Sequence, residues 1–360
     1  MPPLPILIAT PLVAPDRVGA FAALHERAPI ELALFGGRSL HATGAVEDPG
    51  VPHRHVTQRG VAVLAARRGA QRAVIAGTVG RLALPGAYAG ARAGGSPFVL
   101  WDALWHQPRS VAHAASAQLM RHVLRHADAV AAYGTHVERY ARSRGAERVV
   151  IAPQAVDRDF WEAPATPAAE RDDLRGCRFA FVGRDGPGKG LGLLLDAWAA
   201  SGRAAAGHTL TLAGPATDPG RDGPGVHALG PLEPVEVRNL LASSDVVVVP
   251  SVPTPTFREP WGLIANEAMH RSLPVIATTA VGAVQGELIR DGHTGLVVPP
   301  QSQALAGALT HLAGDRVERH RLGTAAHAAV QALTSGAWAD GIVRAVELAE
   351  RHHRTREHRP

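Results

Sequence analysis

The fold is indicated most clearly by the stretch Phe181-Val182-Gly183-Arg184-Asp185-Gly186-Pro187-Gly188-Lys189-Gly190. An apolar run leads into a glycine-rich turn, and an amphipathic stretch from Leu191 to Ala200 follows, which predicts a strand, a turn and a helix. The first N–H groups of a helix are unpaired, and the helix dipole is positive at that end. Such a turn therefore forms an anion-binding site, and we interpret this segment as one that binds phosphate.

Lys189 is the single lysine of a chain that contains 37 lysine and arginine residues in all. An ammonium group is a compact point charge, whereas guanidinium is a planar fork, so the two are not interchangeable at a tight site. We predict that Arg184 and Lys189 hold a diphosphate between them. The alternative is a lysine that persists by chance on a surface loop.

Composition limits the class of protein. The chain has 360 residues, enough for two ordinary domains, and its 46% hydrophobic and 19% charged content is typical of a globular protein. The single cysteine, Cys177, cannot form an internal disulfide, and no apolar run reaches the ~18 residues that span a bilayer. The N-terminal run at residues 3–10 has the character of a buried strand, not of a signal peptide. We expect a cytoplasmic location.

The positive charge lies mainly in the first half, where residues 1–175 contain 20 arginines and 15 acidic residues. An excess of this kind fits an anionic acceptor or a membrane surface, so peripheral contact with the inner face of a membrane stays open. A general bias toward arginine explains it equally well. Aromatic residues make up 4% of the chain and do not alternate with basic ones, so no nucleic-acid partner is expected.

Short apolar runs alternate with longer amphipathic ones, which is typical of parallel strands joined by helices. Helices are expected at Val61–Arg68 and Ala112–His126. Strands are expected at Ile6–Ala9, Ile30–Leu34, Ala73–Ala76, Phe98–Trp101, Ala129–Ala132, Val149–Ala152, Phe179–Val182, Thr209–Ala213, Val246–Val249, Val275–Thr278 and Gly295–Val298. A Pro- and Ala-rich segment at 162–170 indicates a linker. We predict two doubly wound α/β domains with ligands at the carboxyl ends of their strands.

A second signal is the run Glu259-Pro260-Trp261-Gly262-Leu263-Ile264-Ala265-Asn266-Glu267, which carries two carboxylates. Proline at position 260 predicts a helix that begins there, which would leave the backbone N–H groups of Trp261 to Leu263 free to bind phosphate oxygens or sugar hydroxyls. Glu267, about two turns along, could accept hydrogen bonds from ribose hydroxyls. Either acid alone could equally belong to a solvated helix face.

The turn also matches most of the nucleotide-binding P-loop, in which two glycines with four residues between them precede a lysine. Gly190 follows Lys189, however, where that motif needs a serine or threonine hydroxyl for magnesium. The strand Val246–Val249 ends in Pro250 instead of an acid. A P-loop ATPase or kinase is therefore disfavoured.

The second half resembles the nucleotide-sugar domain of family 4 glycosyltransferases over residues 178–315. The first half is similar more loosely, at Pro97–Trp101, Ala127–Val130 and Ile151–Asp157. The matching segments of the second half are Gly183-Arg184 with Lys189-Gly190, Leu212–Gly214, Leu229–Leu232, Ser244–Val246, Pro250-Ser251, Glu259 with Glu267, Pro274–Ala277 and Gly292–Val297. The resemblance implies the GT-B fold, in which two Rossmann-like domains face each other across a cleft.

The same resemblance implies a retaining, metal-independent transfer of a sugar from a nucleoside-diphosphate donor, UDP or GDP being favoured, with no cofactor. Arg184 and Lys189 would hold the diphosphate and stabilise charge on the departing nucleotide. Glu259 would meet the hydroxyls of the donor sugar, and Glu267 the ribose. The remaining donor contacts would come from Gly183, Gly230 to Leu232, Trp261, Gly262 and Leu263.

The first half departs from the family at the loop after the first strand, where residues 10–19 offer one glycine and two prolines. A family histidine near the donor sugar has two counterparts, Asp102 and His106, of which His106 is favoured by residue type. Arg81, behind another strand, is a further candidate on the acceptor side or a plain turn residue. The acceptor is open among small metabolites, lipid head groups, saccharides and natural products, and so is the oligomeric state.

The domains are expected at residues 1–160 for the acceptor and 176–335 for the donor, with a linker at 161–175. Residues 336–360 would form a helix around Trp338–Glu350 that packs back on the first domain, and then a solvated, frayed tail. Two alternatives to a transferase stay open: another GT-B enzyme such as a nucleotide-sugar epimerase, and a nucleotide-sugar-binding protein without turnover. A pyridoxal-type phosphorylase would need a lysine Schiff base, for which the setting of Lys189 is wrong.

Overall fold

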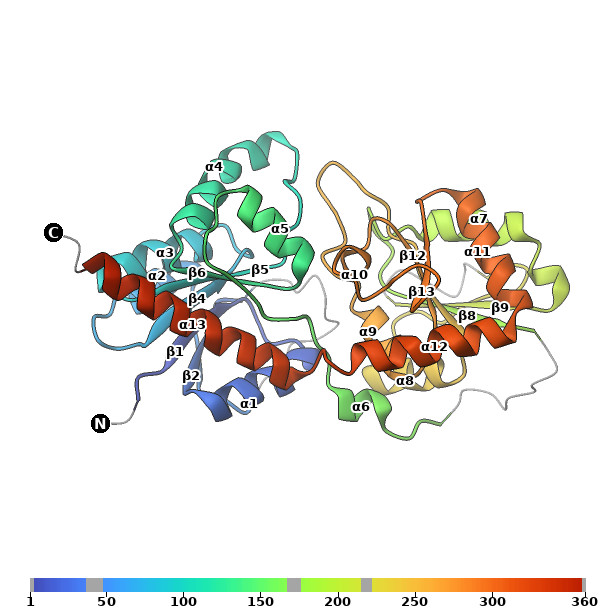
Figure 1. Ribbon diagram of the computed structural model, residues 1–360, viewed down its shortest axis with the longest axis horizontal. Coiled ribbons are helices and arrows are strands. Elements are labelled where there is room, and N and C mark those ends of the chain that lie inside the picture. The colour runs from blue at the N-terminus through green and yellow to red at the C-terminus, as the bar shows by residue number, and fades with distance from the viewer. Residues whose placement is uncertain (1–2, 37–47, 167–175, 215–221, 358–360) are drawn as a thin grey trace. The chain divides into compact units, whose positions relative to one another are not determined.

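The computed structural model describes residues 3–36, 48–166, 176–214 and 222–357. The chain forms two compact units, the first made of Met1–Asp157 with Leu333–Pro360 and the second of Arg158–Ala332 (Figure 1). Most of the predicted linker, residues 167–175, lies outside the described residues. Its first two residues, Trp161 and Glu162, still belong to helix α6 (Arg158–Glu162).

Unit 1 is a sheet of seven parallel strands flanked by helices. Its strands, in spatial order, are β3 (His53–His55), β2 (Ile30–Leu34), β1 (Ile6–Thr10), β4 (Ala73–Gly77), β5 (Phe98–Asp102), β6 (Ala129–Ala132) and β7 (Val149–Ile151). Its helices are η1 (Pro15–Arg17), α1 (Val18–Arg27), α2 (Gln58–Ala65), α3 (Ala83–Gly94), α4 (Val111–His126), α5 (Thr135–Ser143) and α13 (Ser335–Glu357). The order reverses beside β1, which makes this a doubly wound sheet.

Unit 2 repeats the plan with six parallel strands. Their spatial order is β10 (Val226–Ala228), β9 (Thr209–Ala213), β8 (Arg178–Val182), β11 (Val246–Val249), β12 (Val275–Thr278) and β13 (Gly295–Val298). The helices are α6, α7 (Leu191–Ser201), η2 (Ala204–Ala206), α8 (Pro234–Ala242), α9 (Ile264–His270), α10 (Gly282–Gln285), α11 (Ser302–Gly314) and α12 (Arg316–Val330). This is the Rossmann order, and the predicted fold class is confirmed.

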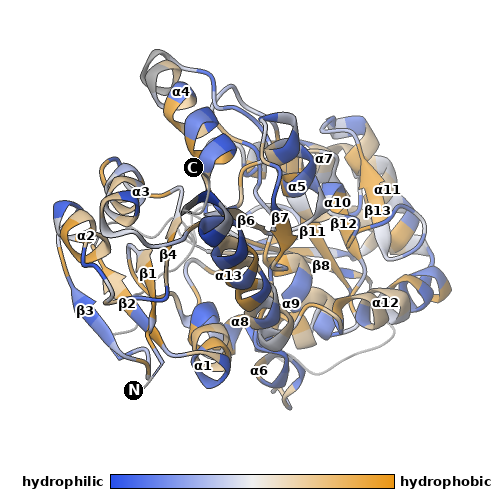
Figure 2. Ribbon diagram, turned by 60° about the vertical axis from the view of Figure 1, so that its left-hand side comes forward, coloured by the Kyte–Doolittle hydropathy of each residue, from blue (hydrophilic) through white to orange (hydrophobic). Residues whose placement is uncertain are grey.

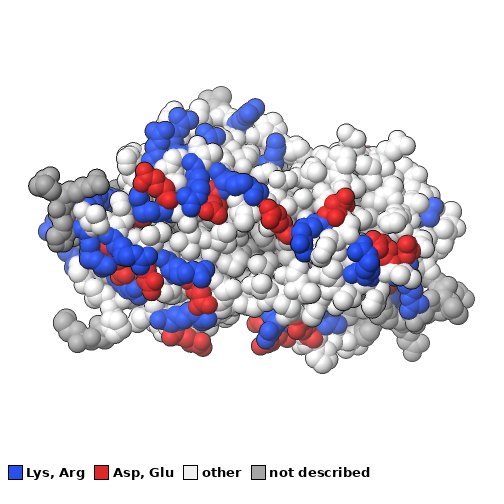
Figure 3. Space-filling view, in the orientation of Figure 1, with Lys and Arg blue, Asp and Glu red and all other residues white. Residues whose placement is uncertain are grey.

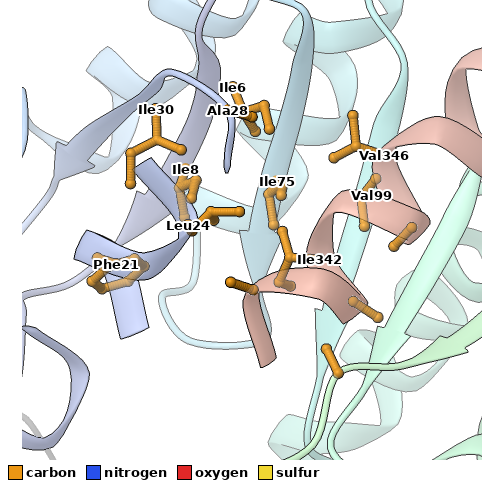
Figure 4. Packing of buried hydrophobic residues seen from close by; sticks show 14 of the residues in the cluster. Ile6, Ile8, Phe21, Leu24, Ala28, Ile30, Ile75, Val99, Ile342 and Val346 are labelled. Atoms are coloured by element: carbon orange, nitrogen blue, oxygen red, sulfur yellow. The ribbon is translucent and has the colours of Figure 1, made fainter. Parts of the chain in front are cut away.

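The core of unit 1 depends on the last helix of the chain. Trp338, Ile342 and Val346 of α13 are each at most 1% exposed and join a cluster with strands β1, β2, β4 and β5. Figure 4 shows Ile342 beside Ile75 and Val346 beside Val99. Each fully buried side chain of this size contributes about 1.5–3 kcal/mol, so the three together hold α13 firmly on unit 1.

The C-terminal tail is more ordered than predicted. Helix α13 continues to Glu357 instead of fraying near residue 350. Its last turns are tied to unit 1 because Arg72 donates to both oxygens of Glu350 at 2.8 and 3.0 Å, and buried His353 pairs with the carbonyl of Gly95 at 3.1 Å. Contacts far apart in the sequence, not the local pattern, extend the helix.

Two strands of the structure were not predicted from the sequence. Strand β3 at the sheet edge reads His53-Arg54-His55 and is hydrophilic along its length (Figure 2), so no apolar run marks it. Strand β10 has three residues and an exposed histidine at its centre. Both are edge strands, which are buried least and carry the weakest sequence signal. No helix in the part of the chain that the structure describes is both long and apolar enough to cross a membrane.

Candidate active site

The candidate site of unit 2 lies at the carboxyl ends of β8 and β11. These strands are neighbours in the sheet, and the strand order reverses between them. The connection after β8 is the glycine turn 183–190, which leads into α7, and the connection after β11 is the loop from Pro250 to Leu263, which leads into α9. At such a switch point the two connections diverge, and doubly wound proteins bind ligands there.

The glycine turn is pressed directly against the loop that follows β11. Gly188 and Gly190 have φ angles of 93° and 76°, which L side chains rarely adopt. A Cβ atom on Gly190 would lie 1.9 Å from the carbonyl oxygen of Pro250, and one on Gly188 would lie 2.1 Å from the ring of Phe257. The N–H of Val252 donates to the carbonyl of Gly188 at 2.9 Å. Only glycine therefore allows this contact between the two loops.

Lys189 and Glu259, two of the predicted site residues, meet at this contact. The Lys189 Nζ lies 2.6 Å from Glu259 Oε2, and the ammonium is 5.7 Å from the centroid of the Phe257 ring. The Glu259 side chain is 4% exposed and that of Lys189 17%. A carboxylate so deeply buried is tolerated only when it is paired and hydrogen-bonded, and Lys189 provides that pairing.

Two residues that the sequence analysis did not single out complete the arrangement. The Ser251 hydroxyl donates to Glu259 Oε2 at 3.2 Å, and the hydroxyl of Thr278 at the end of β12 donates to the carbonyl of Ser251. Ser251 is 1% exposed and Thr278 0%. A polar residue at or just past the carboxyl end of a buried strand was the available signal for both, because the carboxyl ends of parallel strands share one edge of the sheet.

The segment between Glu259 and Glu267 differs from the prediction. Helix α9 begins at Ile264, so Pro260 does not start it. The backbone instead turns at Gly262, where φ is 91°, and a Cβ on Gly282 would lie 1.9 Å from the Pro260 carbonyl oxygen. This close approach holds Pro260 beside α10 and outside the helix.

The turn at Gly262 still leaves backbone donors at this edge. Among the described residues, the N–H groups of Gly262 and Leu263 donate no hydrogen bond. Half-buried Glu267 lies in the first turn of α9. The Trp261 indole donates to Asn266 at 2.6 Å, so it fixes the turn against the helix.

Three glycines align at the edge beside the pair. A Cβ on Gly214, after β9, would lie 2.2 Å from the Gly183 carbonyl oxygen, and the Gly214 N–H donates to the carbonyl of Gly230 at 2.7 Å. After each of the strands β8, β9 and β10 the chain therefore continues through a glycine that carries no side chain. Half-buried Leu232 lies two residues past Gly230. Arg184 follows Gly183, and its Nε is buried without a hydrogen-bond partner in the described part of the chain.

The acceptor-side candidates all lie in unit 1. Asp102 ends β5 and is completely buried, and its Oδ1 accepts from the Leu104 N–H at 2.9 Å. Burial raises the pKa of the Asp102 carboxyl to about 7, although the backbone N–H groups of Leu104 and Ala103 oppose the shift. Half-buried His106 lies four residues on, and Arg81 is exposed on the loop after β4.

Among the residues that the structure describes, no group of three or more His, Cys, Asp or Glu side chains is arranged so that it could hold a metal ion.

Comparison with known proteins finds similarity to glycosyltransferases, mainly in unit 2. Residues 176–315 match the family model of glycosyl transferases group 1. The D-inositol 3-phosphate glycosyltransferase of Corynebacterium glutamicum is 34% identical over 137 residues, 36% of this chain and 31% of that protein. The glycogen synthase of Mycobacterium tuberculosis is 30% identical over 201 residues, 53% of this chain and 45% of that protein. The chain thus matches less than half of the length of either curated relative.

Solved structures extend the likeness to the whole chain. HepE of Anabaena, in a crystal structure with UDP and glucose, superposes with a TM-score of 0.72 at 20% identity, covering 96% of this chain and 99% of that one. OtsA has the same TM-score at 13% identity, with coverage of 96% and 99%. These likenesses establish a two-domain GT-B fold. Within it, the match of residues 176–315 to the glycosyl transferases group 1 model agrees with the resemblance predicted from the sequence.

Proposed function

We propose that the protein is a retaining, metal-independent glycosyltransferase that moves a sugar from a UDP-sugar to a hydroxyl of an acceptor. The observation that carries the proposal is the buried pair of Lys189 and Glu259 at the switch point of unit 2, with Arg184 on the same glycine turn as Lys189. A cation, a buried carboxylate and free backbone N–H groups at one edge match what a sugar diphosphate presents: anionic oxygens next to hydroxyl groups.

The roles follow from the chemistry of the leaving group. When the bond from the anomeric carbon to the diphosphate breaks, negative charge grows on the outer phosphate, and Lys189 and Arg184 stabilise it. Lys189 then bonds to phosphate as well as to Glu259, so the carboxylate of Glu259 gains room to accept hydrogen bonds from sugar hydroxyls. The N–H groups of Gly262 and Leu263 contact phosphate oxygens or sugar hydroxyls, and Glu267 accepts from the ribose.

The choice of UDP is supported by HepE, which is described in complexes with UDP, with UDP and glucose, and with UDP-glucose. The names of the curated relatives point to different acceptors, inositol phosphate and glycogen, so the acceptor is left as a hydroxyl compound. In unit 1, His106, favoured by residue type, and Asp102 are the two candidates for the family histidine that the resemblance implies, and Arg81 is a candidate contact to the acceptor. The free thiol of Cys177 fits the cytoplasmic location that is part of this proposal.

The test is turnover of UDP-glucose and GDP-sugars, measured as nucleotide release, with and without a panel of acceptors and with chelator present. We expect release with one nucleotide and unchanged rates in chelator. Product anomers identified by NMR should keep the donor's configuration. Lys189→Ala and Glu267→Ala should be inactive, whereas the matched control Arg316→Gln, on an exposed position of α12, should behave as wild type. Sugar epimerisation would contradict this proposal in favour of an epimerase. Nucleotide binding without release would contradict it in favour of a binding protein without turnover.

A further inference from the structure

A buried arginine follows the first strand of unit 1 and has no role in the account above. Arg17 closes η1 and is only 8% exposed. Its Nη2 donates to the hydroxyl of Tyr133 at 3.4 Å and to the side-chain oxygen of Gln154. Its Nη1 is buried and has no hydrogen-bond partner among the described residues. One end of the guanidinium is therefore unpaired.

The protein balances the charge of Arg17 only in part. The carboxylate of Asp16 is 3.6 Å from Nε, beyond the usual hydrogen-bond distance. The rings of Trp101, Tyr133 and Trp338 surround the guanidinium, with centroids 5.3, 5.6 and 6.0 Å from its carbon. Contacts with aromatic rings stabilise a cation less than its removal from water destabilises it. A further anionic partner would complete the site.

Other buried polar atoms nearby also lack partners. The indole N–H groups of Trp101 and Trp338, whose ring centroids are 5.4 Å apart, have no acceptor within the described residues. The same holds for Oδ2 of Asp102, which is 0% exposed. Native proteins leave few buried polar atoms unpaired, because each one destabilises the fold. Four unpaired buried polar atoms around one edge of the sheet indicate that a bound ligand supplies their hydrogen-bond partners.

The location agrees with this interpretation. Arg17 follows β1, Asp102 ends β5, Tyr133 follows β6 and Gln154 follows β7, so all four lie at the carboxyl edge of the sheet. Ligands of doubly wound proteins bind at that edge. Burial raises the pKa of Tyr133; the charge of Arg17 opposes this shift and the charges of Asp16 and Asp102 add to it, so the Tyr133 hydroxyl stays protonated.

We propose that this edge binds the acceptor, and that the acceptor carries an anionic group, a phosphate monoester or a carboxylate, that pairs with Arg17. Asp102 accepts a hydrogen bond from one of its hydroxyls. Because Nη1 is enclosed, the Arg17 side chain turns away from Tyr133 and Gln154 as the anion enters. This assignment rests on the proposed function, since it names the acceptor of that reaction.

The charge of unit 1 favours the same partner. The arginine excess of the chain lies in its first half, and Figure 3 shows arginine side chains gathered on the visible face of unit 1. A positive surface raises the local concentration of an anionic substrate and speeds its association.

The experiment measures binding of three related probes, glucose 6-phosphate, glucuronate and glucose, by thermal shift and calorimetry. Saturating UDP is present so that the phosphate site of unit 2 is filled, and the series is repeated in the Lys189→Ala background, which weakens that site. The proteins are wild type, Arg17→Gln, Arg17→Lys and the control Arg142→Gln. Arg142 is exposed in unit 1 and pairs with Glu138 along its own helix.

We expect one charged probe to bind wild type and the control equally, and glucose to bind neither. Arg17→Gln should weaken that binding about 10- to 100-fold, the range of a hydrogen bond to a charged group, and Arg17→Lys should restore part of it. Glucose 6-phosphate alone would indicate a phosphate monoester, and glucuronate alone a carboxylate. The ligand-induced shift is compared within each variant, so a lower melting temperature of Arg17→Gln does not obscure the result.

Equal binding of the charged probes to Arg17→Gln and to the control, or no binding to wild type, would overturn the inference. Failure of UDP itself to stabilise wild type would count against the proposed function instead. The anion titration in the Lys189→Ala background then still decides the role of Arg17.

Discussion

Breaking the pair of Lys189 and Glu259 should destabilise unit 2 as well as abolish donor binding. In Lys189→Met the Glu259 side chain, 4% exposed, loses its cation, while the hydroxyl of Ser251, 3.2 Å away, still donates to it. Removal of one partner from a buried ion pair costs about 3–5 kcal/mol. Lys189 keeps 17% of its side-chain surface exposed, so the lower end of that range is expected.

This energy is large enough to measure by urea unfolding or calorimetry of the full chain. For a unit of 150–250 residues, each kcal/mol shifts the melting temperature by roughly 2–4 °C, so a loss of about 3 kcal/mol should make Lys189→Met melt about 6–12 °C below wild type. The double variant Lys189→Met/Glu259→Gln replaces the pair with neutral groups of similar volume. Such replacements are often neutral for stability, so the double variant should recover most of the loss.

Function should not recover with stability. Both variants lack the ammonium, so UDP should bind neither, although the double variant should recover most of the lost stability. A single variant as stable as wild type, or a double variant less stable than Lys189→Met, would refute the description of the pair as buried and mutually dependent.

Three further outcomes are expected. Lys189→Arg should bind UDP at least about tenfold more weakly than wild type by calorimetry, because the planar guanidinium does not fit where a compact ammonium lies; unchanged affinity would contradict this. Gly190→Ala should unfold earlier in urea than wild type, since its Cβ would lie 1.9 Å from the Pro250 carbonyl oxygen at a φ of 76°; equal stability would show that the two loops are not in contact. For Asp102, burial raises the pKa to about 7, so the native state keeps a proton that the unfolded state loses above about pH 4. Wild type should therefore lose up to about 4 kcal/mol of stability as the pH rises from about 4 to 7, and Asp102→Asn should lack this dependence in urea unfolding at pH 5 and pH 8.

The buried strands could be predicted from the sequence because strands of a parallel sheet are covered on both faces and read as short apolar runs. Val246–Val249 is such a run, and the structure has it as a strand with the same bounds. Strand β3 lies at an edge and reads His53-Arg54-His55, so the same rule cannot detect it.

The components of the candidate site could be predicted, but not how they pair. The glycine turn and the two carboxylates are visible as local patterns, whereas the contact of Lys189 with Glu259 joins residues 70 positions apart. From the sequence, Ser251 was recognised only as part of a segment that matches the family. Its hydrogen bond to Glu259 depends on how the loop between the two residues turns. Arg17 is hidden for another reason: in a chain rich in arginine, only burial distinguishes it.

The central claim is that the edge of unit 2 around Lys189 binds a nucleoside diphosphate. Calorimetric titration of wild type, Lys189→Ala and the control Arg316→Gln with UDP, GDP, ADP and TDP tests it most directly. We predict that UDP binds wild type and the control with equal affinity and that Lys189→Ala loses this binding. Equal UDP affinity of Lys189→Ala and wild type, or no nucleotide bound by wild type, would contradict it.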